Sequence, residues 1–466
     1  MIVSISRSDV LWNYAGLFFR LGVNFFILPL LMAFLTEDSL GLWYVFVSIG
    51  SFTALFQLGF SPALARNIAY CVAGAKTLNV ESAARSIDQR DEISWPLFAN
   101  VILVSKKMYR LIALLALVIM LSAGSFYISV IGSSVDGALG AWLLYSFGAF
   151  LNLYYLYYES LLRGIGSIAS VNKATVLSVV IQLIVVWVCF FFNLGIFSPV
   201  VGYVTQGVIF RFSCSKYFWS NHVVSTSFCI GDLNRYSDRA LQRSLYRIIS
   251  PNAYRDGIVS LSNYLATQAN TIICSSFISL AQAGMFSVAS QIVNAVASVA
   301  SAYINACHPQ LQMLYARSDY SGEERLIEKA SSSFVITYLF GSALVGFAVL
   351  PILGIIRESY AIDFPFYVLM VGYYFIWKVG TNFAAFISNH NTIPYVKAFI
   401  ISSILGVLLS IFFVTALDAG VWGLVIGQLI SQVIYNFWKW PEVVAGWFNK
   451  NTFVFFIDGI KLWLKG

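Results

Sequence analysis

Apolar segments of about twenty residues recur along the whole chain, and they limit what it can fold into. About 20 apolar residues cross the hydrocarbon layer of a bilayer as one helix. Of the 466 residues, 59% are apolar and only 11% are charged, which is too little charge to solvate a globular surface. Because a backbone in lipid must satisfy its own hydrogen bonds, we predict an all-α integral membrane protein. A soluble enzyme and a disordered chain are excluded.

We predict about twelve membrane-spanning helices in two sets of six. The first six are expected at residues 10–35, 39–61, 111–131, 138–162, 174–192 and 194–215. The second six are expected at residues 258–277, 284–307, 333–356, 364–387, 394–417 and 420–438.

The basic residues orient these helices. Almost all of the 28 Lys and Arg lie in or beside alternate connecting segments, which include the long ones at 62–110 and 216–257. The short connections on the other side carry acidic residues such as Glu37 and Asp136. The positive-inside rule therefore places both termini in the cytoplasm. The net charge of +7 is a topology signal, and nucleic acid is not an expected partner.

Four regions follow from this topology. They are an N-terminal six-helix lobe at 1–215, a cytoplasmic linker at 216–257, a C-terminal six-helix lobe at 258–438 and an interfacial amphipathic tail at 439–466. Arginines spaced four apart in the linker, such as Arg239 and Arg243, suit anionic lipid headgroups. Simple retention on the cytoplasmic side explains these arginines equally well.

The two halves resemble each other. The pair Tyr154–Tyr155 with Asn172 recurs at the same spacing as Tyr373–Tyr374 with Asn391. Duplicated bundles are common in transporters, so we predict an internal repeat in which Glu159 corresponds to Lys378.

Several predicted spans carry polar stripes, whereas a helix that faces only lipid is apolar all round. The stripes suit a hydrated cavity, although hydrogen bonding between helices explains such residues too. Their members include Arg20, Asn24, Asn263, Asn270, Asn294, Tyr374, Lys378 and Asn382.

Arg20 and Lys378 carry the functional argument. Arg20 lies about 15 Å, or ten residues, from the inner end of its predicted helix, and Lys378 lies about 14 Å, or nine residues, from the inner end of its own. Both positions are near the middle of the membrane. An ionised side chain there costs about 2.5–3.5 kcal/mol on insertion scales. Glu159 is the one borderline carboxylate, and it cannot neutralise two cations. The surplus predicts an anionic ligand, and the alternative is capping of helix carbonyls or a pair with Glu159.

Aromatic side chains lie beside these charges in the sequence, including Tyr155 and Tyr374. Rings near a cationic site suit sugar stacking, and packing or a membrane-interface belt is an equal alternative. The six cysteines have no metal-ligand spacing, so we expect no metal and no cofactor.

The segment QLGFSPALARNIAY at 57–70, followed by AGAK at 73–76, resembles the exit of the second span in Wzx-type O-antigen and polysaccharide flippases. These flippases belong to the MOP (MATE-like) exporter superfamily. The length, the twelve spans and the two lobes agree with the same resemblance. The resemblance implies alternating access across the bacterial inner membrane, through a cationic, aromatic-lined cavity between the lobes.

The resemblance also implies a substrate, an undecaprenyl-diphosphate-linked oligosaccharide carried from the inner to the outer leaflet. Arg20, Lys378 and the exit residue Arg66 suit the binding of such a substrate, and Glu159 is the candidate for ion coupling. The bilayer is the other expected partner, and binding of further polysaccharide assembly proteins to the basic loops is left open.

Two other functions are compatible with parts of this pattern. A multidrug or lipid II exporter of the same superfamily would have the same architecture, although cationic drugs favour acidic cavities. A polytopic glycan polymerase would need a substantial outer loop with catalytic groups, and no predicted outer loop is long. No common hydrolase, protease or phosphate-loop motif occurs either.

Overall fold

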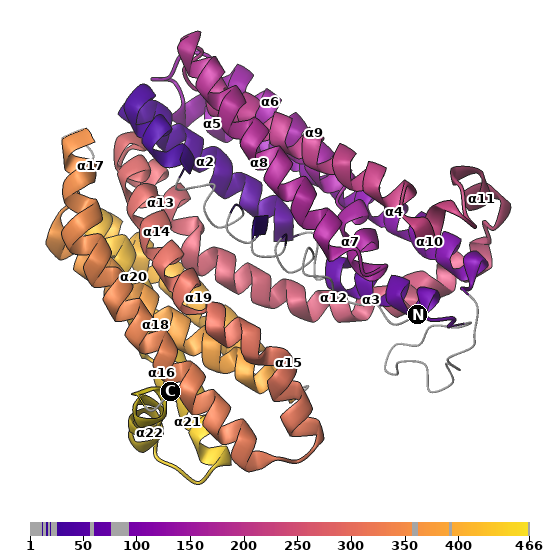
Figure 1. Ribbon diagram of the computed structural model, residues 1–466. Helices are drawn as coiled ribbons and strands as arrows, with labels where there is room; N and C mark the ends of the chain where they lie inside the picture. Colours follow the sequence, from indigo (N-terminus) through magenta and orange to yellow (C-terminus); the bar gives the residue numbers. More distant parts are fainter. Residues whose placement is uncertain are drawn as a thin grey trace. The chain divides into compact units, whose positions relative to one another are not determined.

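The computed structural model describes residues 12, 15, 16, 19, 26–55, 60–75, 93–356, 362–390 and 394–464. Within these ranges every regular element is a helix (Figure 1). Arg20 and Asn24, which the sequence assigns to the substrate site, lie outside the described residues, as does Asn391 of the predicted repeat.

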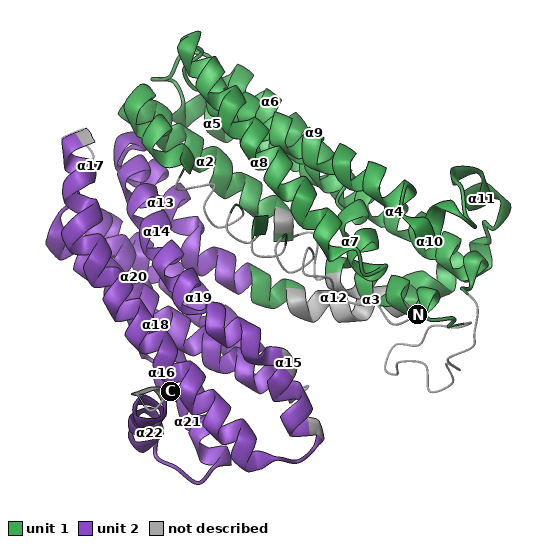
Figure 2. Cartoon of the chain, viewed as in Figure 1, with its two compact units in different colours: residues 1–260 green, residues 261–466 purple. Residues whose placement is uncertain are grey.

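The chain divides into two compact units, Met1–Ser260 and Leu261–Gly466 (Figure 2). Their boundary lies inside a single helix, α12 (Arg239–Thr267). The second part of the predicted linker therefore continues directly into the seventh predicted span. The predicted boundary at residues 257 and 258 lies where the charged residues stop, but α12 continues across it.

The first continuous described helix of unit 1 is residues 26–34, and eleven further helical elements follow before α12. These are α2 (Glu37–Ala54), α3 (Phe60–Val72), α4 (Trp95–Ile119), η2 (Met120–Gly124), α5 (Ser125–Ile131), α6 (Ala138–Tyr154), α7 (Tyr157–Gly164), α8 (Ile168–Phe191), α9 (Phe197–Trp219), α10 (His222–Ser225) and α11 (Ile230–Arg235).

Unit 2 continues from the end of α12. Its further helices are α13 (Ala269–Phe277), α14 (Leu280–Ala300), α15 (Ala302–Ala316), α16 (Tyr320–Leu344), η3 (Val345–Val349), α17 (Leu350–Ile356), α18 (Phe364–Ser388), α19 (Val396–Thr415), α20 (Gly420–Val433), α21 (Asn436–Trp447) and α22 (Thr452–Leu464).

Seven helical stretches among the described residues are long and apolar enough to cross a membrane. They are Trp95–Ile131, Ala138–Gly164, Ile168–Phe191, Leu280–Ala300, Tyr320–Ile355, Val396–Thr415 and Gly420–Trp447. Some predicted spans are interrupted: the seventh changes from α12 to α13 at Gln268, and the eighth from α14 to α15 at Ser301. Twelve spans and the orientation of the termini stay predictions.

Two long helices begin well before their predicted spans. The helix predicted from residue 111 begins at Trp95, and the one predicted from residue 333 begins at Tyr320. In α16 the added first residues are polar, so hydropathy does not assign them to a span. In α4 the added start is apolar, and Lys106, Lys107 and Arg110 separate it from the predicted span. Ser94 precedes α4 with a proline in its first turn, and Asp319 caps α16 by accepting a hydrogen bond from Gly322.

The same two helices each contain a π-helical turn, η2 in unit 1 and η3 in unit 2. A π-turn is an insertion that changes the hydrogen-bond pattern of the α-helix locally. The indole of Trp142 on α6 donates to the Met120 carbonyl at 3.1 Å. In unit 2 the hydroxyl of Tyr367 on α18 donates to the Ser342 carbonyl at 2.7 Å. Each unit therefore has an aromatic donor from a neighbouring helix at its π-turn or one turn before it.

The buried core of unit 1 is rich in aromatic side chains where α4 and α9 approach. The ring of Phe98 stacks on that of Phe218 with centroids 6.3 Å apart, and Phe228 lies edge-on to Phe98 at 5.4 Å. All three side chains are buried. Aromatic pairs in these geometries add to the stabilisation from buried area. This cluster fixes α9, which carries a charged residue of the candidate site.

The C-terminal helix α22 packs directly on α16. A Cβ atom at Gly459 would overlap the hydroxyl of Ser332 and the carbonyl of Glu328, so only glycine allows this approach. Phe455 is fully buried against Phe383 and Phe448. On other faces of α22, Phe453 is 73% exposed, which is consistent with the predicted interfacial tail. The helix therefore belongs to the core of unit 2 as well.

Candidate functional site

An ion network in unit 1 contains the predicted coupling residue. Glu159 on α7 accepts hydrogen bonds at Oε1 from Nη2 and Nε of Arg163, at 2.8 Å and 3.2 Å. Its Oε2 accepts from Nη1 of Arg211 on α9, at 3.3 Å. Two arginines thus share one carboxylate, which leaves the trio with one surplus positive charge. We call these three residues the Glu159 trio.

Arg211 is the residue of this trio that sequence reasoning missed. It lies close to the predicted end of its span at residue 215, and was therefore grouped with the cytoplasmic charges. The structure ends α9 at Trp219, so Arg211 lies about 12 Å, or eight residues, from the helix end. Its side chain is only 13% exposed. The apolar residues Val208 and Phe212 around it are the signal that could have placed it inside the span.

The surroundings of Arg211 leave part of its hydrogen-bonding capacity unused. The guanidinium carbon lies 4.7 Å from the centroid of the Phe210 ring. Its Nε is buried and has no hydrogen-bond partner among the described residues. A guanidinium has five donors, and burying one without a partner is costly.

Two cavities within unit 1 share Arg211. One has a volume of about 330 Å³ and is largely polar, lined by Asn152, Glu159, Thr175, Val179, Gln206, Phe210 and Arg211. The other has a volume of about 300 Å³ and is mainly apolar, lined by Leu151, Tyr155, Tyr158, Gly207, Val208, Arg211, Phe212 and Ser215. Both volumes reach the lower end of the range of small-molecule sites.

The backbone brings α6 and α9 close together beside these cavities. A Cβ atom at Gly207 would overlap the side-chain amide of Asn152, so glycine is required at this crossing. Tyr155, predicted to bind substrate, lines the apolar cavity and is 38% exposed. Its ring lies edge-on to Tyr154, with centroids 4.7 Å apart. The structure thus brings two of the predicted residues, Tyr155 and Glu159, to neighbouring cavities.

The second charged position is Lys378 on α18 in unit 2. Its Nζ lies 4.6 Å from the centroid of the Trp377 ring, a cation–π distance. Tyr374, one turn earlier, is buried, and its ring lies edge-on to Trp377 at 5.8 Å. No carboxylate in the described part of the chain forms an ion pair with Lys378. The alternative of a structural ion pair is therefore not observed within these residues.

The predicted asparagines of unit 2 have different environments. Asn270 is buried and accepts a hydrogen bond from Gln428 at 3.3 Å, and Asn382 is buried and donates to Ser301 at 3.3 Å. Both therefore make the hydrogen bonds between helices that the sequence left open as an alternative. Asn263 and Asn294 are partly exposed.

Arg66, the predicted exit residue, is exposed on α3. Whether it and the predicted asparagines bind substrate stays a prediction.

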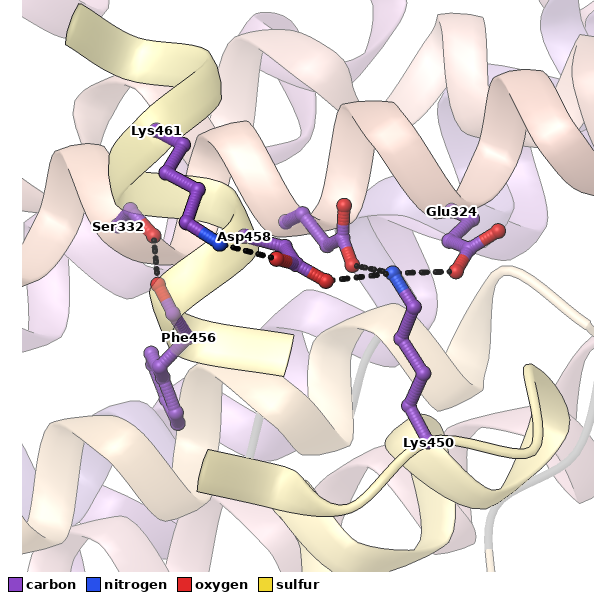
Figure 3. Close-up of polar contacts among 7 residues, drawn as sticks. Glu324, Ser332, Lys450, Phe456, Asp458 and Lys461 are labelled. Carbon is purple, nitrogen blue, oxygen red and sulfur yellow. Dashed lines mark hydrogen bonds and ion pairs between the residues drawn. The ribbon is translucent and has the colours of Figure 1, made fainter. Parts of the chain in front are cut away.

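Sequence reasoning did not anticipate a charge cluster outside the predicted spans of unit 2 (Figure 3). Lys450 contacts Glu324 at 2.9 Å, Glu328 at 2.6 Å and Asp458 at 3.1 Å. It thereby joins α16 to α22, and Ser332 donates to the Phe456 carbonyl beside it. We call Lys450 and its three carboxylates the Lys450 cluster. Because it fixes a helix in place, we assign it a structural role.

Neither a protein-family model nor a curated protein matches this chain. Solved structures do. The chain is similar to the inward-facing conformation of a multidrug resistance MATE family transporter of the MOP superfamily, with a TM-score of 0.57 and 15% identity over 92% of this chain and 100% of that one.

Two further structures are similar. One is a MOP superfamily transporter from Pyrococcus furiosus whose reverse polarity of the binding pocket suggests a different function; its TM-score is 0.52, with 14% identity over 98% of this chain and 94% of that one. The other is MATE in complex with MaL6, with a TM-score of 0.50 and 15% identity over 94% of this chain and 96% of that one. At these identities the likeness concerns the fold. The chain has the MATE-like, multi-pass membrane fold that the sequence predicted.

Proposed function

We propose that the chain is a flippase that moves an undecaprenyl-diphosphate-linked oligosaccharide from the inner to the outer leaflet of a bacterial inner membrane. It would act by alternating access in the assembly of O-antigen or another surface polysaccharide. The observation that carries the proposal is Lys378, a cation within a predicted span that no described carboxylate neutralises.

The charge balance supports an anionic substrate. A buried charge without a partner is destabilising, so a protein retains it where a ligand supplies the opposite charge. The Glu159 trio has one surplus positive charge, and Lys378 contributes a second in the other unit. A diphosphate supplies negative charge where lipid cannot solvate it.

The uncharged groups suit the rest of such a substrate. Amides and a hydroxyl line the polar cavity of unit 1 and can hydrogen-bond to sugar hydroxyls. Tyr374 and Trp377 lie beside the cation of unit 2, where aromatic rings favour stacking on sugars. The polyprenyl chain is soluble in the bilayer and needs no polar site.

A multidrug exporter is the second candidate, because the MATE structures that resemble this chain include multidrug transporters. Cationic drugs, however, favour a carboxylate that is free to pair with them. Glu159, the one borderline carboxylate of the predicted spans, is already bonded to two arginines.

Deletion of the gene followed by lipid analysis separates these functions. The flippase proposal expects a complete lipid-linked repeat unit to accumulate on the inner leaflet, with loss of surface polysaccharide. A polymerase defect would instead leave single repeat units on the outer leaflet. Normal polysaccharide together with increased drug sensitivity would support the multidrug alternative and reject the proposal.

A further inference from the structure

The Glu159 trio is asymmetric, and this asymmetry points to one of its arginines as the ligand-binding group. Arg163 lies on the same helix as Glu159 and contacts Oε1 through two nitrogens, at 2.8 Å and 3.2 Å. Arg211 lies on another helix and reaches Oε2 through a single, longer contact of 3.3 Å. Two charge-assisted hydrogen bonds to Oε1 therefore hold Arg163 to the carboxylate, whereas Arg211 has one, and it is longer. Of the two arginines, Arg211 is therefore the easier to displace from the carboxylate.

Arg211 is also the arginine that borders both cavities. In the polar cavity it lies among Asn152, Thr175 and Gln206, whose amides and hydroxyl suit a hydroxylated ligand. In the apolar cavity it lies beside Val208 and Phe212, which are 45% and 67% exposed and so form part of the surface of the unit. A charged group at Arg211 can thus be joined to a polar part and to a hydrocarbon part.

The unused donor of Arg211 completes the argument. Its buried Nε has no hydrogen-bond partner among the described residues, whereas a phosphate oxygen would satisfy it. If a phosphate takes Arg211 away from Oε2, Arg163 still neutralises Glu159 through Oε1. No charge in the trio would then be left without a partner.

We propose that Arg211 binds the phosphate of a membrane amphiphile by exchanging its contact with Glu159 for the ligand, while Arg163 holds the carboxylate. Arg211 is the binding residue, and Glu159 and Arg163 are positioning residues. The proposal deepens the proposed function and rests on it for the identity of the amphiphile. The phosphate belongs either to the isoprenoid carrier or to bulk phospholipid.

The test measures binding of farnesyl diphosphate to the purified full-length protein in phosphatidylcholine nanodiscs. Arg211→Gln is expected to weaken binding at least tenfold. The double variant Glu159→Gln/Arg163→Gln removes the competing carboxylate and keeps Arg211 as the only cation of the trio. It is expected to bind as tightly as wild type or more tightly. Arg110→Gln, an exposed arginine on α4, is the matched control and should change nothing.

Whether loss of the Glu159 carboxylate strengthens or weakens the binding of farnesyl diphosphate separates ligand exchange from a purely structural ion pair. Unchanged binding in Arg211→Gln would overturn the proposal, and so would weaker binding in the double variant when it is measured well below that variant's own melting temperature. If Arg211→Gln fails to fold, Arg211→Lys in the same double-variant background replaces it. That triple variant keeps the charge, loses the forked geometry and is expected to bind severalfold more weakly.

A second arm identifies the source of the phosphate. In nanodiscs that contain phosphatidylglycerol, an Arg211-dependent loss of affinity for farnesyl diphosphate assigns the site to bulk phospholipid. Unchanged affinity assigns it to the isoprenoid carrier. Both results support the site.

The proposed function fails independently. If the deletion strain does not accumulate lipid-linked oligosaccharide while Arg211-dependent binding persists, the flippase function is wrong and the phosphate site stands. If the oligosaccharide accumulates but binding does not depend on Arg211, the flippase function stands and the phosphate site at Arg211 is wrong.

Discussion

The two units use shared ion pairs in opposite ways. In unit 1 one carboxylate, Glu159, serves two arginines, and the trio lies at the cytoplasmic ends of two predicted spans. In unit 2 one lysine, Lys450, serves three carboxylates outside the predicted spans, and it fixes α22 to α16. Lys378 differs from both, because it has an aromatic neighbour and no described ionic partner. The candidates for ligand binding are thus Lys378, which has no described ionic partner, and Arg211, which a single contact holds to Glu159.

The strongest test of this comparison is Lys378→Ala. Because no described carboxylate depends on Lys378, its removal should leave insertion and stability unchanged and yet abolish glycan export. Surface polysaccharide and the amount of protein in the membrane are the two measurements. Lys397→Ala, an exposed lysine on α19, is the matched control. Wild-type polysaccharide in Lys378→Ala would contradict the proposed role, and Arg20→Ala is expected to behave like Lys378→Ala.

Removing the shared carboxylate should lower the stability of the protein, which Lys378→Ala should leave unchanged. Glu159→Ala leaves Arg211, which is only 13% exposed, without its ionic partner. We expect unfolding to become easier by about 2–3 kcal/mol, somewhat less than for a fully buried pair. Thermal denaturation in detergent measures this. Glu442→Ala, which breaks an exposed pair with Lys439, should change stability by less than about 0.5 kcal/mol. Equal melting temperatures for the two variants would refute the distinction.

The Lys450 cluster should be weaker than the Glu159 trio, because Lys450 is 27% exposed. Lys450→Ala leaves the buried Glu328 without its cation, and we expect a loss of about 1–2 kcal/mol with release of α22. Faster proteolysis of α22 in the folded protein would report that release. Lys461→Ala removes only an exposed contact to Asp458, so α22 should remain protected. If α22 stays protected in Lys450→Ala, its packing on α16 is sufficient alone.

The smallest effect concerns pH. Partial burial opposes the charge of Lys450, but hydrogen bonds to Glu328, Glu324 and Asp458 outweigh it and raise its pKa. A raised lysine pKa stabilises the fold below the ordinary lysine pKa, and this contribution is lost as pH rises through the raised value. Protection of α22 should therefore persist through the ordinary lysine range. Loss of protection at mildly alkaline pH would argue against the cluster.

Local sequence patterns predicted the helical membrane fold, because hydrophobic length and loop charge are local properties. Helix starts were less well predicted, since α16 begins in polar residues and the apolar start of α4 is separated from its predicted span by Lys106, Lys107 and Arg110. The depth of Lys378 in the membrane stays a prediction from counting along its helix. The contact between Glu159 and Arg211 could not be predicted, because it depends on α7 and α9 meeting, and nothing in the sequence near Glu159 specifies that contact.

The π-turns η2 and η3 have a practical consequence for anyone who scans these helices with single cysteines. Successive residues of an α-helix turn by about 100°, so labelling should follow a 3.6-residue rhythm from Trp95 onward. One inserted residue displaces that rhythm by a full step beyond Met120–Gly124, and again beyond Val345–Val349. A lipid-facing stripe traced through α4 or α16 will therefore jump sideways before it reaches α5 or α17.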